Sequence, residues 1–138
     1  MNVLTFDTEE QIGIAAGYYM CGQVLQKPDS VLGLATGSTP LKPYAHMIKL
    51  YQDGAVDFSK VTTFNLDEYC NLDVKDKNSY HSFMYENLFD HINIPDENIN
   101  FLNGNAEDMD AECKAYEKRI KKCGGIDIQL LGIGSNGH

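Results

Sequence analysis

The feature that most constrains the fold is an alternation of short apolar runs with longer segments of helical periodicity. Four runs have the length and composition of buried β-strands, at residues 30–35, 61–66, 98–103 and 126–134. Helical segments are predicted from a capping box at 8–11, from Pro40, over 78–92 with Ser79 as cap, and over 108–123. Such alternation favours a parallel β-sheet with helices on both faces. We therefore predict one α/β domain over residues 1–138, Rossmann-like and doubly wound.

The spacing of apolar residues predicts an inner face for the first helix. Ile12, Ala15, Ala16 and Tyr19 recur at helical intervals after the capping box. We expect these four residues to form its inner face. The preceding run "NVLTF", residues 2–6, is β-prone.

Composition excludes some classes of partner. The chain is 43% hydrophobic and 22% charged, as is ordinary for a globular protein, and its net charge is −9. This charge disfavours nucleic acid, because Lys and Arg supply most of the affinity for a phosphate backbone. No apolar run approaches the roughly 20 residues of a membrane span, and no leader of the charged-then-apolar type precedes the first helix. We expect a cytoplasmic protein with no membrane partner.

The cysteines do not form a metal-binding or disulfide pattern. Cys21, Cys70, Cys113 and Cys123 lie far apart, without a C-x-x-C pair or a histidine at ligand spacing. We interpret them as reduced thiols and expect no metal site. A catalytic Cys70 stays open because it follows "DEY", although the sequence supplies it with no obvious base.

In parallel sheets, ligands bind beyond the carboxyl ends of the strands. The loops to search are therefore 35–40, 66–78, 103–108 and 134–138. In loop 103–108, Asn105 is a candidate ligand contact. Tyr80, Phe83 and Tyr85 are interpreted as packing residues.

The loop "ATGSTP", residues 35–40, joins a predicted strand to a predicted helix. Gly37 permits a tight turn, and the N–H groups of Gly37, Ser38 and Thr39 can converge on one anion at the positive end of the helix dipole. A phosphate monoester is the simplest such anion. The alternative is an ordinary helix start with Thr39 as N-cap.

The segment "TFNLDEY", residues 63–69, places Asp67 and Glu68 at the tip of a buried strand. Adjacent side chains point to opposite sides, so one carboxylate can face the cleft as a general base. The spacing does not indicate which one. A solvated acidic turn is the alternative.

The terminal segment "GIGSNGH" matches G-x-G-x-x-G at Gly132, Gly134 and Gly137. A dinucleotide fingerprint normally follows the first strand of its unit, opens a helix and has an acidic residue about 20 positions later. This match follows the last predicted strand, so we reject a nicotinamide or flavin site. A glycine loop before His138 suits a proton donor or acceptor, and Asn136 can orient a hydroxyl or a water.

Together, "GLATGSTP", "TFNLDEY", "NSYHSFM", "NINFLNGNA" and "LLGIGSNGH" resemble the N-terminal half of the glucosamine-6-phosphate deaminase family, in the same order over the whole chain. The resemblance implies that Gly37, Ser38 and Thr39 bind the sugar phosphate. It also implies that Asp67 moves a proton between C2 and C1, and that His138 helps to open the pyranose ring. Asn136 falls where many members have Asp.

The resemblance further implies conversion of glucosamine 6-phosphate and water to fructose 6-phosphate and ammonia, without metal or organic cofactor. The family's Glu after this histidine and its basic phosphate ligands lie beyond the chain. We therefore expect an N-terminal portion of a longer sugar-phosphate isomerase/deaminase domain, apparently truncated and inactive alone. A homo-oligomer is left open. The alternatives are a 6-phosphogluconolactonase-type hydrolase and a non-catalytic sugar-phosphate-binding effector domain.

Overall fold

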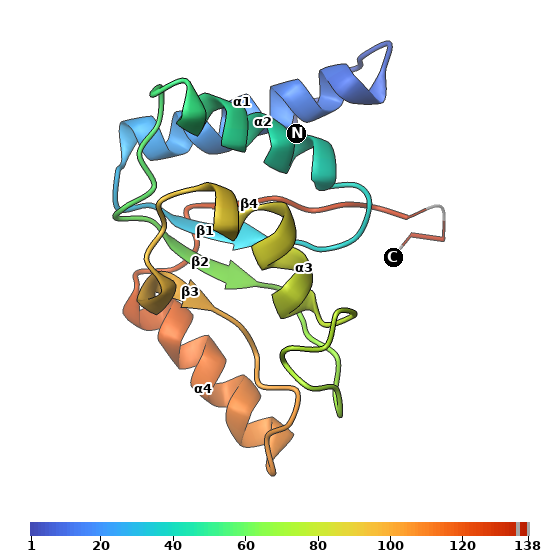
Figure 1. Ribbon diagram of the computed structural model, residues 1–138, viewed down its shortest axis with the longest axis vertical. Helices are drawn as coiled ribbons and strands as arrows, with labels where there is room; N and C mark the ends of the chain where they lie inside the picture. Colours follow the sequence, from blue (N-terminus) through green and yellow to red (C-terminus); the bar gives the residue numbers. More distant parts are fainter. Residues whose placement is uncertain (135, 138) are drawn as a thin grey trace.

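A computed structural model describes residues 1–134, 136 and 137, and in this part of the chain four parallel strands form one sheet in the order β3-β2-β1-β4 (Figure 1). The strands are β1 (Val31–Leu34), β2 (Thr62–Asn65), β3 (Ile99–Asn100) and β4 (Ile128–Gln129). Each is shorter than its predicted run. The parallel sheet predicted from the alternation is confirmed.

The helices begin largely where the capping signals predict. They are α1 (Glu9–Gln26), α2 (Leu41–Gln52), α3 (Tyr80–Asn87) and α4 (Met109–Lys122), with short 3₁₀ helices η1 (Phe89–His91) and η2 (Asp96–Asn98). Thr8 and Ser79 accept backbone N–H groups as N-caps, as expected. The predicted helix 78–92 is interrupted, because Leu88 leaves helical geometry between α3 and η1. No helix in the described residues has the length and apolar character needed to cross a membrane.

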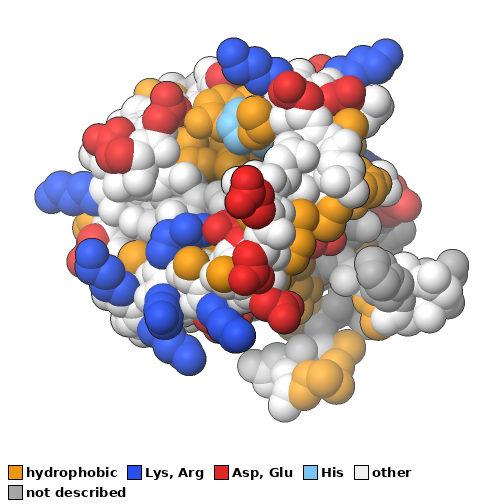
Figure 2. All heavy atoms as spheres, turned by 90° about the horizontal axis from the view of Figure 1, so that it is seen from below, with side chains coloured by type: hydrophobic (Ala, Val, Ile, Leu, Met, Phe, Trp, Pro, Cys, Tyr) orange, Lys and Arg blue, Asp and Glu red, His pale blue; other side chains and the backbone are white. Residues whose placement is uncertain are grey.

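Helices cover both faces of the sheet, as predicted (Figure 1). Leu32 and Leu34 point to the face where residues of α1, α2 and α3 complete the larger core cluster. Val31 and Phe64 point to the opposite face and pack with Tyr116 of α4. Seen from below the view of Figure 1, the outer surface of the molecule carries both basic and acidic side chains (Figure 2).

The predicted inner face of α1 is wrong at Ile12 and Tyr19, while Ala15 and Ala16 are half-buried. Ile12 and Tyr19 are 50% and 62% exposed, whereas the buried residues of this helix include Gly13 and Gly17. A Cβ atom at Gly13 would lie 2.4 Å from the Cβ of Lys42, so α1 meets α2 through its glycine face. The helices approach too closely there for larger side chains. Residues 2–6 are exposed and do not form a strand.

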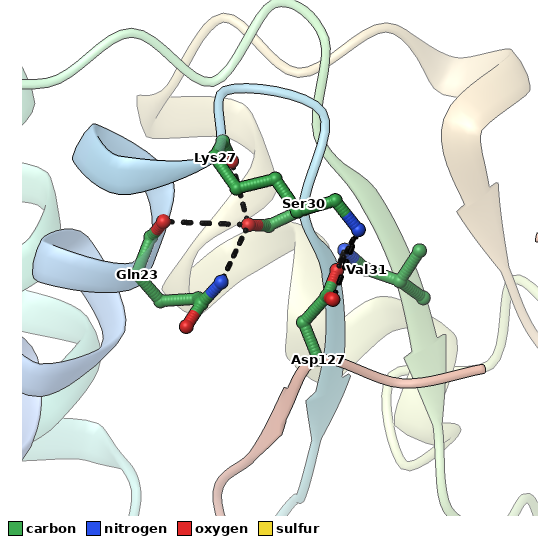
Figure 3. Close-up of polar contacts among 5 residues, drawn as sticks. All are labelled: Gln23, Lys27, Ser30, Val31 and Asp127. Atoms are coloured by element: carbon green, nitrogen blue, oxygen red, sulfur yellow. Dashed lines mark hydrogen bonds and ion pairs between the residues drawn. The ribbon is translucent and has the colours of Figure 1, made fainter. Parts of the chain in front are cut away.

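At the amino end of the sheet, one carboxylate joins β4 to β1 (Figure 3). Asp127 Oδ2 accepts the Val31 N–H at 2.8 Å and lies 2.7 Å from Lys27 Nζ, while the Asp127 N–H donates to the Val31 carbonyl at 2.8 Å. Ser30, fully buried beside them, donates to the Lys27 carbonyl at 2.6 Å and accepts from Gln23 at 3.2 Å. This network sets the register of two strands far apart in sequence.

Candidate active site

Three loops leave the sheet side by side at its carboxyl edge. Leu66 N–H donates to the Leu34 carbonyl at 3.2 Å, and Leu130 N–H donates to the Gly33 carbonyl at 2.9 Å. The loops after β1, β2 and β4 therefore start next to one another. Past β4, a Cβ atom at Gly132 would lie 3.3 Å from Thr39 Cβ, so the last segment contacts the loop after β1.

The glycine loop, residues 36–39, is held at its base by Tyr44 of α2. The buried Tyr44 hydroxyl donates to the Ala35 carbonyl at 2.5 Å and accepts the Ala35 N–H at 3.2 Å. Burial raises the pKa of this phenol, so it stays a protonated donor. Both backbone groups of the residue before the loop are thereby satisfied within the core. Gly37 itself is exposed, with a left-handed φ of 96°.

The geometry of the glycine loop bears on its two interpretations. The N-cap of α2 is Pro40, without a side-chain capping bond, so the interpretation of Thr39 as N-cap is wrong. Within the described residues, the N–H groups of Gly37, Ser38 and Thr39 donate no hydrogen bond to the protein. All three residues are exposed. Three available amide donors near a helix start are what an anion site requires, and anion binding here stays a prediction.

The acidic tip, Asp67 and Glu68, separates into two environments. Asp67 is exposed at the carboxyl edge. Glu68 turns toward α3, where its Oε1 accepts the Tyr80 N–H at 2.9 Å and its Oε2 accepts the His81 N–H at 2.8 Å. Glu68 therefore has a structural role at a helix N-terminus, where the dipole favours an anion. The role of Asp67 as general base stays a prediction.

Two tyrosines lie beside the acidic tip, and one of them, Tyr80, was expected to be a packing residue. The rings of Tyr69 and Tyr80 lie 4.6 Å apart, and both line a cavity of about 550 Å³ that also borders Gly37. A hydrogen bond with Tyr69, burial and the charge of Asp67 raise the pKa of Tyr80 to about 12. A hydrogen bond with Thr36 of the glycine loop acts in the opposite direction. Tyr80 thus lines this cavity and is half-buried, rather than packed in the core; its place as first residue of α3, after the acidic tip, was the available signal.

The loop after β3 supports the loop after β2. Asn71, at a φ of 60°, donates its N–H to the Gly104 carbonyl at 3.0 Å, and Asn105 Nδ2 donates to the Leu72 carbonyl at 2.7 Å. A Cβ atom at Gly104 would lie 1.9 Å from the Tyr69 carbonyl oxygen, so only glycine fits. The Asn105 amide group thus holds a neighbouring loop, and its contact with a ligand stays a prediction.

The remaining predicted residues are only partly placed. Asn136 is exposed in a turn, and His138 lies outside the described residues. Cys70 is an exposed thiol in the wall of the cavity. The described residues contain no group of three or more His, Cys, Asp or Glu side chains that could hold a metal ion.

Fold and site together define a class: a doubly wound α/β protein with an amide-lined glycine loop and an acidic tip at one edge of a parallel sheet. Residues 20–138 match the family model described as glucosamine-6-phosphate isomerases/6-phosphogluconolactonase. The chain belongs to this family.

Relatives with high identity carry one name. The chain is 51% identical to the glucosamine-6-phosphate deaminase of Thermoanaerobacter sp. (strain X514), over all of this chain and 54% of that protein. It is 50% identical to the glucosamine-6-phosphate deaminase of Clostridium botulinum (strain Loch Maree / Type A3), over all of this chain and 57% of that one. The chain thus spans about half the length of the curated relatives it matches.

Solved structures share the fold. A monomeric glucosamine-6-phosphate deaminase superposes with a TM-score of 0.96 at 44% identity, covering 100% of this chain and 57% of that one. The 6-phosphogluconolactonase of Thermotoga maritima superposes with a TM-score of 0.76 at 22% identity, covering 99% and 61%. The second likeness concerns the fold alone.

Proposed function

We propose that this chain supplies the N-terminal portion of a longer sugar-phosphate isomerase/deaminase domain. The complete enzyme is a glucosamine-6-phosphate deaminase that isomerises and hydrolytically deaminates glucosamine 6-phosphate to fructose 6-phosphate and ammonia. The observation that carries the proposal is the adjacency of the glycine loop and the acidic tip, which leave neighbouring strands β1 and β2 at one edge. The identity of about half to deaminases over the whole chain supports the same activity.

In the proposed mechanism, the amides of Gly37, Ser38 and Thr39 bind the phosphate and thereby set the distance of the sugar carbons from β2. The carboxylate of Asp67 removes the C2 proton and returns it to C1, which turns the C1 aldehyde into an alcohol and leaves a protonated imine at C2. A base held in register with the carbon accelerates such a step by roughly 10²–10⁴-fold. Water then adds at C2 and ammonia leaves, without metal or organic cofactor.

The last segment has a supporting part in this mechanism. His138 assists ring opening as proton donor and acceptor. Asn136 orients a hydroxyl or a water by hydrogen bonding. Asn cannot carry charge, so Asn136 acts by hydrogen bonding alone, without the negative charge that Asp supplies at this position in many members of the family. Basic phosphate ligands and a further Glu come from the rest of the enzyme. The protein acts in the cytoplasm on a small sugar phosphate, with neither nucleic acid nor membrane as partner.

The alternative activity is hydrolysis of 6-phosphogluconolactone. Solved lactonases resemble this chain at 17–26% identity, well below the 44–51% of the deaminases. A third candidate, a non-catalytic effector domain, would bind the sugar phosphate without chemistry at Asp67. No feature of the described site favours lactone hydrolysis over deamination.

The deciding experiment measures ammonia released from glucosamine 6-phosphate by the complete enzyme, beside hydrolysis of 6-phosphogluconolactone. We expect ammonia and fructose 6-phosphate in equal amounts, with no lactone hydrolysis above the spontaneous rate. Lactone hydrolysis without ammonia would establish the hydrolase instead. Binding of the sugar phosphate without turnover of either compound would establish the effector domain.

A further inference from the structure

The unassigned carboxylate of Glu68 joins the acidic tip to the start of α3. Its Oε1 accepts the N–H groups of Tyr69 at 2.8 Å and Tyr80 at 2.9 Å, and its Oε2 accepts that of His81 at 2.8 Å. The hydroxyl of Ser79 accepts the next amide of the helix, at 3.0 Å. Glu68 therefore completes the pairing of the first helical N–H groups, which have no partner inside the helix itself.

These bonds bring together residues 12 and 13 positions apart in the chain. Because Glu68 directly follows Asp67, its bonds to the start of α3 join the two ends of the loop after β2. They also place Tyr80 with its ring 4.6 Å from that of Tyr69, in the wall of the cavity beside Gly37. One carboxylate thus holds both the backbone that carries Asp67 and the tyrosine that faces the glycine loop.

The far side of the same loop is held independently. Asn71 and Leu72 bind the loop after β3 through Gly104 and Asn105, at 3.0 and 2.7 Å. The loop after β2 is therefore held at two places, by Glu68 near its start and by the loop after β3. Such fixation matters because a displacement of about 1 Å in a catalytic group can lower a rate by roughly 100-fold.

We propose that Glu68 is a positioning residue: it contacts no substrate, but by binding the first amides of α3 it holds Asp67 and Tyr80 in place beside the glycine loop. This inference rests on the proposed deaminase function. The neighbouring carboxylates Asp67 and Glu68 then have separate tasks, proton transfer and alignment.

The test compares Glu68→Gln with the matched control Glu86→Gln in the complete enzyme. Gln keeps the size of Glu, but its side-chain NH₂ group is a donor and cannot accept a hydrogen bond from the backbone N–H groups of α3. We expect kcat for glucosamine 6-phosphate to fall roughly 10–100-fold with KM within about twofold, because alignment is lost and phosphate binding is kept. Exchange of the C2 proton with deuterated water continues at a reduced rate, and the pH profile keeps its shape. Glu86 is exposed on the same helix, and its variant should match the wild type.

A second readout does not depend on catalysis. Amide hydrogen exchange at Tyr80 and His81 should accelerate roughly tenfold or more in Glu68→Gln and stay unchanged in Glu86→Gln. If the complete enzyme releases no ammonia, the proposed function is contradicted, but the amide hydrogen exchange at Tyr80 and His81 still tests whether Glu68 holds the start of α3.

Two results would overturn the inference. Wild-type kcat together with unchanged exchange at Tyr80 and His81 would mean that Glu68 positions nothing. Loss of C2 exchange in Glu68→Gln as complete as in Asp67→Asn would make Glu68 a catalytic residue. If Glu68→Gln does not fold, Glu68→Asp keeps the charge and shortens the side chain: a lower kcat at constant KM supports positioning, and wild-type kcat overturns it.

Discussion

At the scale of single residues, two buried tyrosines hold the strand ends from which the functional loops depart. Tyr44 binds both backbone groups of Ala35, at the end of β1. From the opposite face, the Tyr116 hydroxyl lies 2.8 Å from the Asn65 carbonyl and 3.0 Å from the Asn100 carbonyl, at the ends of β2 and β3. A phenol can do this from the core because its ring is apolar and only its tip is polar. Tyrosine hydroxyls from the core thus bind the backbone at the strand ends, and these bonds use no polar side chain of the loops.

Replacement of Tyr44 by Phe should therefore destabilise the protein beyond the loss of one contact. Two buried backbone groups of Ala35 lose their partner, at a cost of about 1–3 kcal/mol in the free energy of unfolding. Urea denaturation measures this. Tyr51→Phe is the control: Tyr51 is only partly buried, and no hydrogen bond of its hydroxyl is found within the described residues, so we expect a change within about 0.5 kcal/mol. Equal effects of the two variants would contradict the role given to Tyr44.

Asp67→Asn tests the proposed base. The variant keeps shape and hydrogen bonding but removes the proton acceptor, so deamination by the complete enzyme should fall roughly 10²–10⁴-fold with little change in substrate binding. C2 proton exchange with deuterated water is the direct measurement. Asp90→Asn, at an exposed position beyond α3, should retain full exchange. Intact exchange in Asp67→Asn, with none in Glu68→Gln, would show that the other carboxylate is the base.

At the scale of elements, the join between β1 and β4 depends on a charged group at the end opposite to the site. A hydrogen bond from Lys27, then one from the Val31 N–H, lower the pKa of Asp127 below its ordinary value. A carboxyl group whose pKa is lowered by folding stabilises the native state above its unfolded pKa of about 3.9, and this contribution is lost as the pH falls through the folded value. The attachment of β4 should therefore weaken in acid.

The prediction is that Asp127→Asn lowers the free energy of unfolding at pH 7 by an amount that stays constant down to about pH 5 and shrinks below about pH 4. Urea titrations at several pH values measure the difference between variant and wild type. Asp53→Asn removes an ion pair in which both side chains are more than half exposed, and we expect little effect at any pH. A difference that grows toward low pH would contradict the assigned sign.

At the scale of the whole molecule, large apolar side chains are exposed both past β4 and on α1. Leu131 and Ile133 are 62% and 82% exposed past β4, and Tyr19 on the outer side of α1 is 62% exposed. Within the described residues, β4 pairs on one side only, with β1. An edge strand with exposed apolar neighbours favours association with another chain.

We therefore expect the 138-residue chain by itself to self-associate and to be catalytically inert, since it spans 54–57% of the length of its deaminase relatives. Sedimentation velocity over a range of concentrations measures the first property, and ammonia release from glucosamine 6-phosphate measures the second. Turnover near 1–10³ s⁻¹, the range of ordinary enzymes, by a strictly monomeric chain would contradict both expectations.

Local sequence signals were enough to predict the order of elements, the parallel sheet, the caps at Thr8 and Ser79, and the loops at the carboxyl edge of the sheet. These follow from local rules, because strand runs, capping residues and glycine turns act over a few neighbouring positions. The glycine loop and the acidic tip could be recognised because the carboxyl ends of parallel strands meet at one edge.

Three features depend on contacts between distant elements: which face of α1 is buried, which tyrosines line the cavity, and which of the two carboxylates binds a helix. Spacing predicted Ile12 and Tyr19 inside, yet the close contact with α2 requires Gly13 instead. The Glu68 bonds reach 12 and 13 residues along the chain. The physical reason is range: periodicity describes one element at a time, whereas these choices depend on the surface that a second, distant element presents.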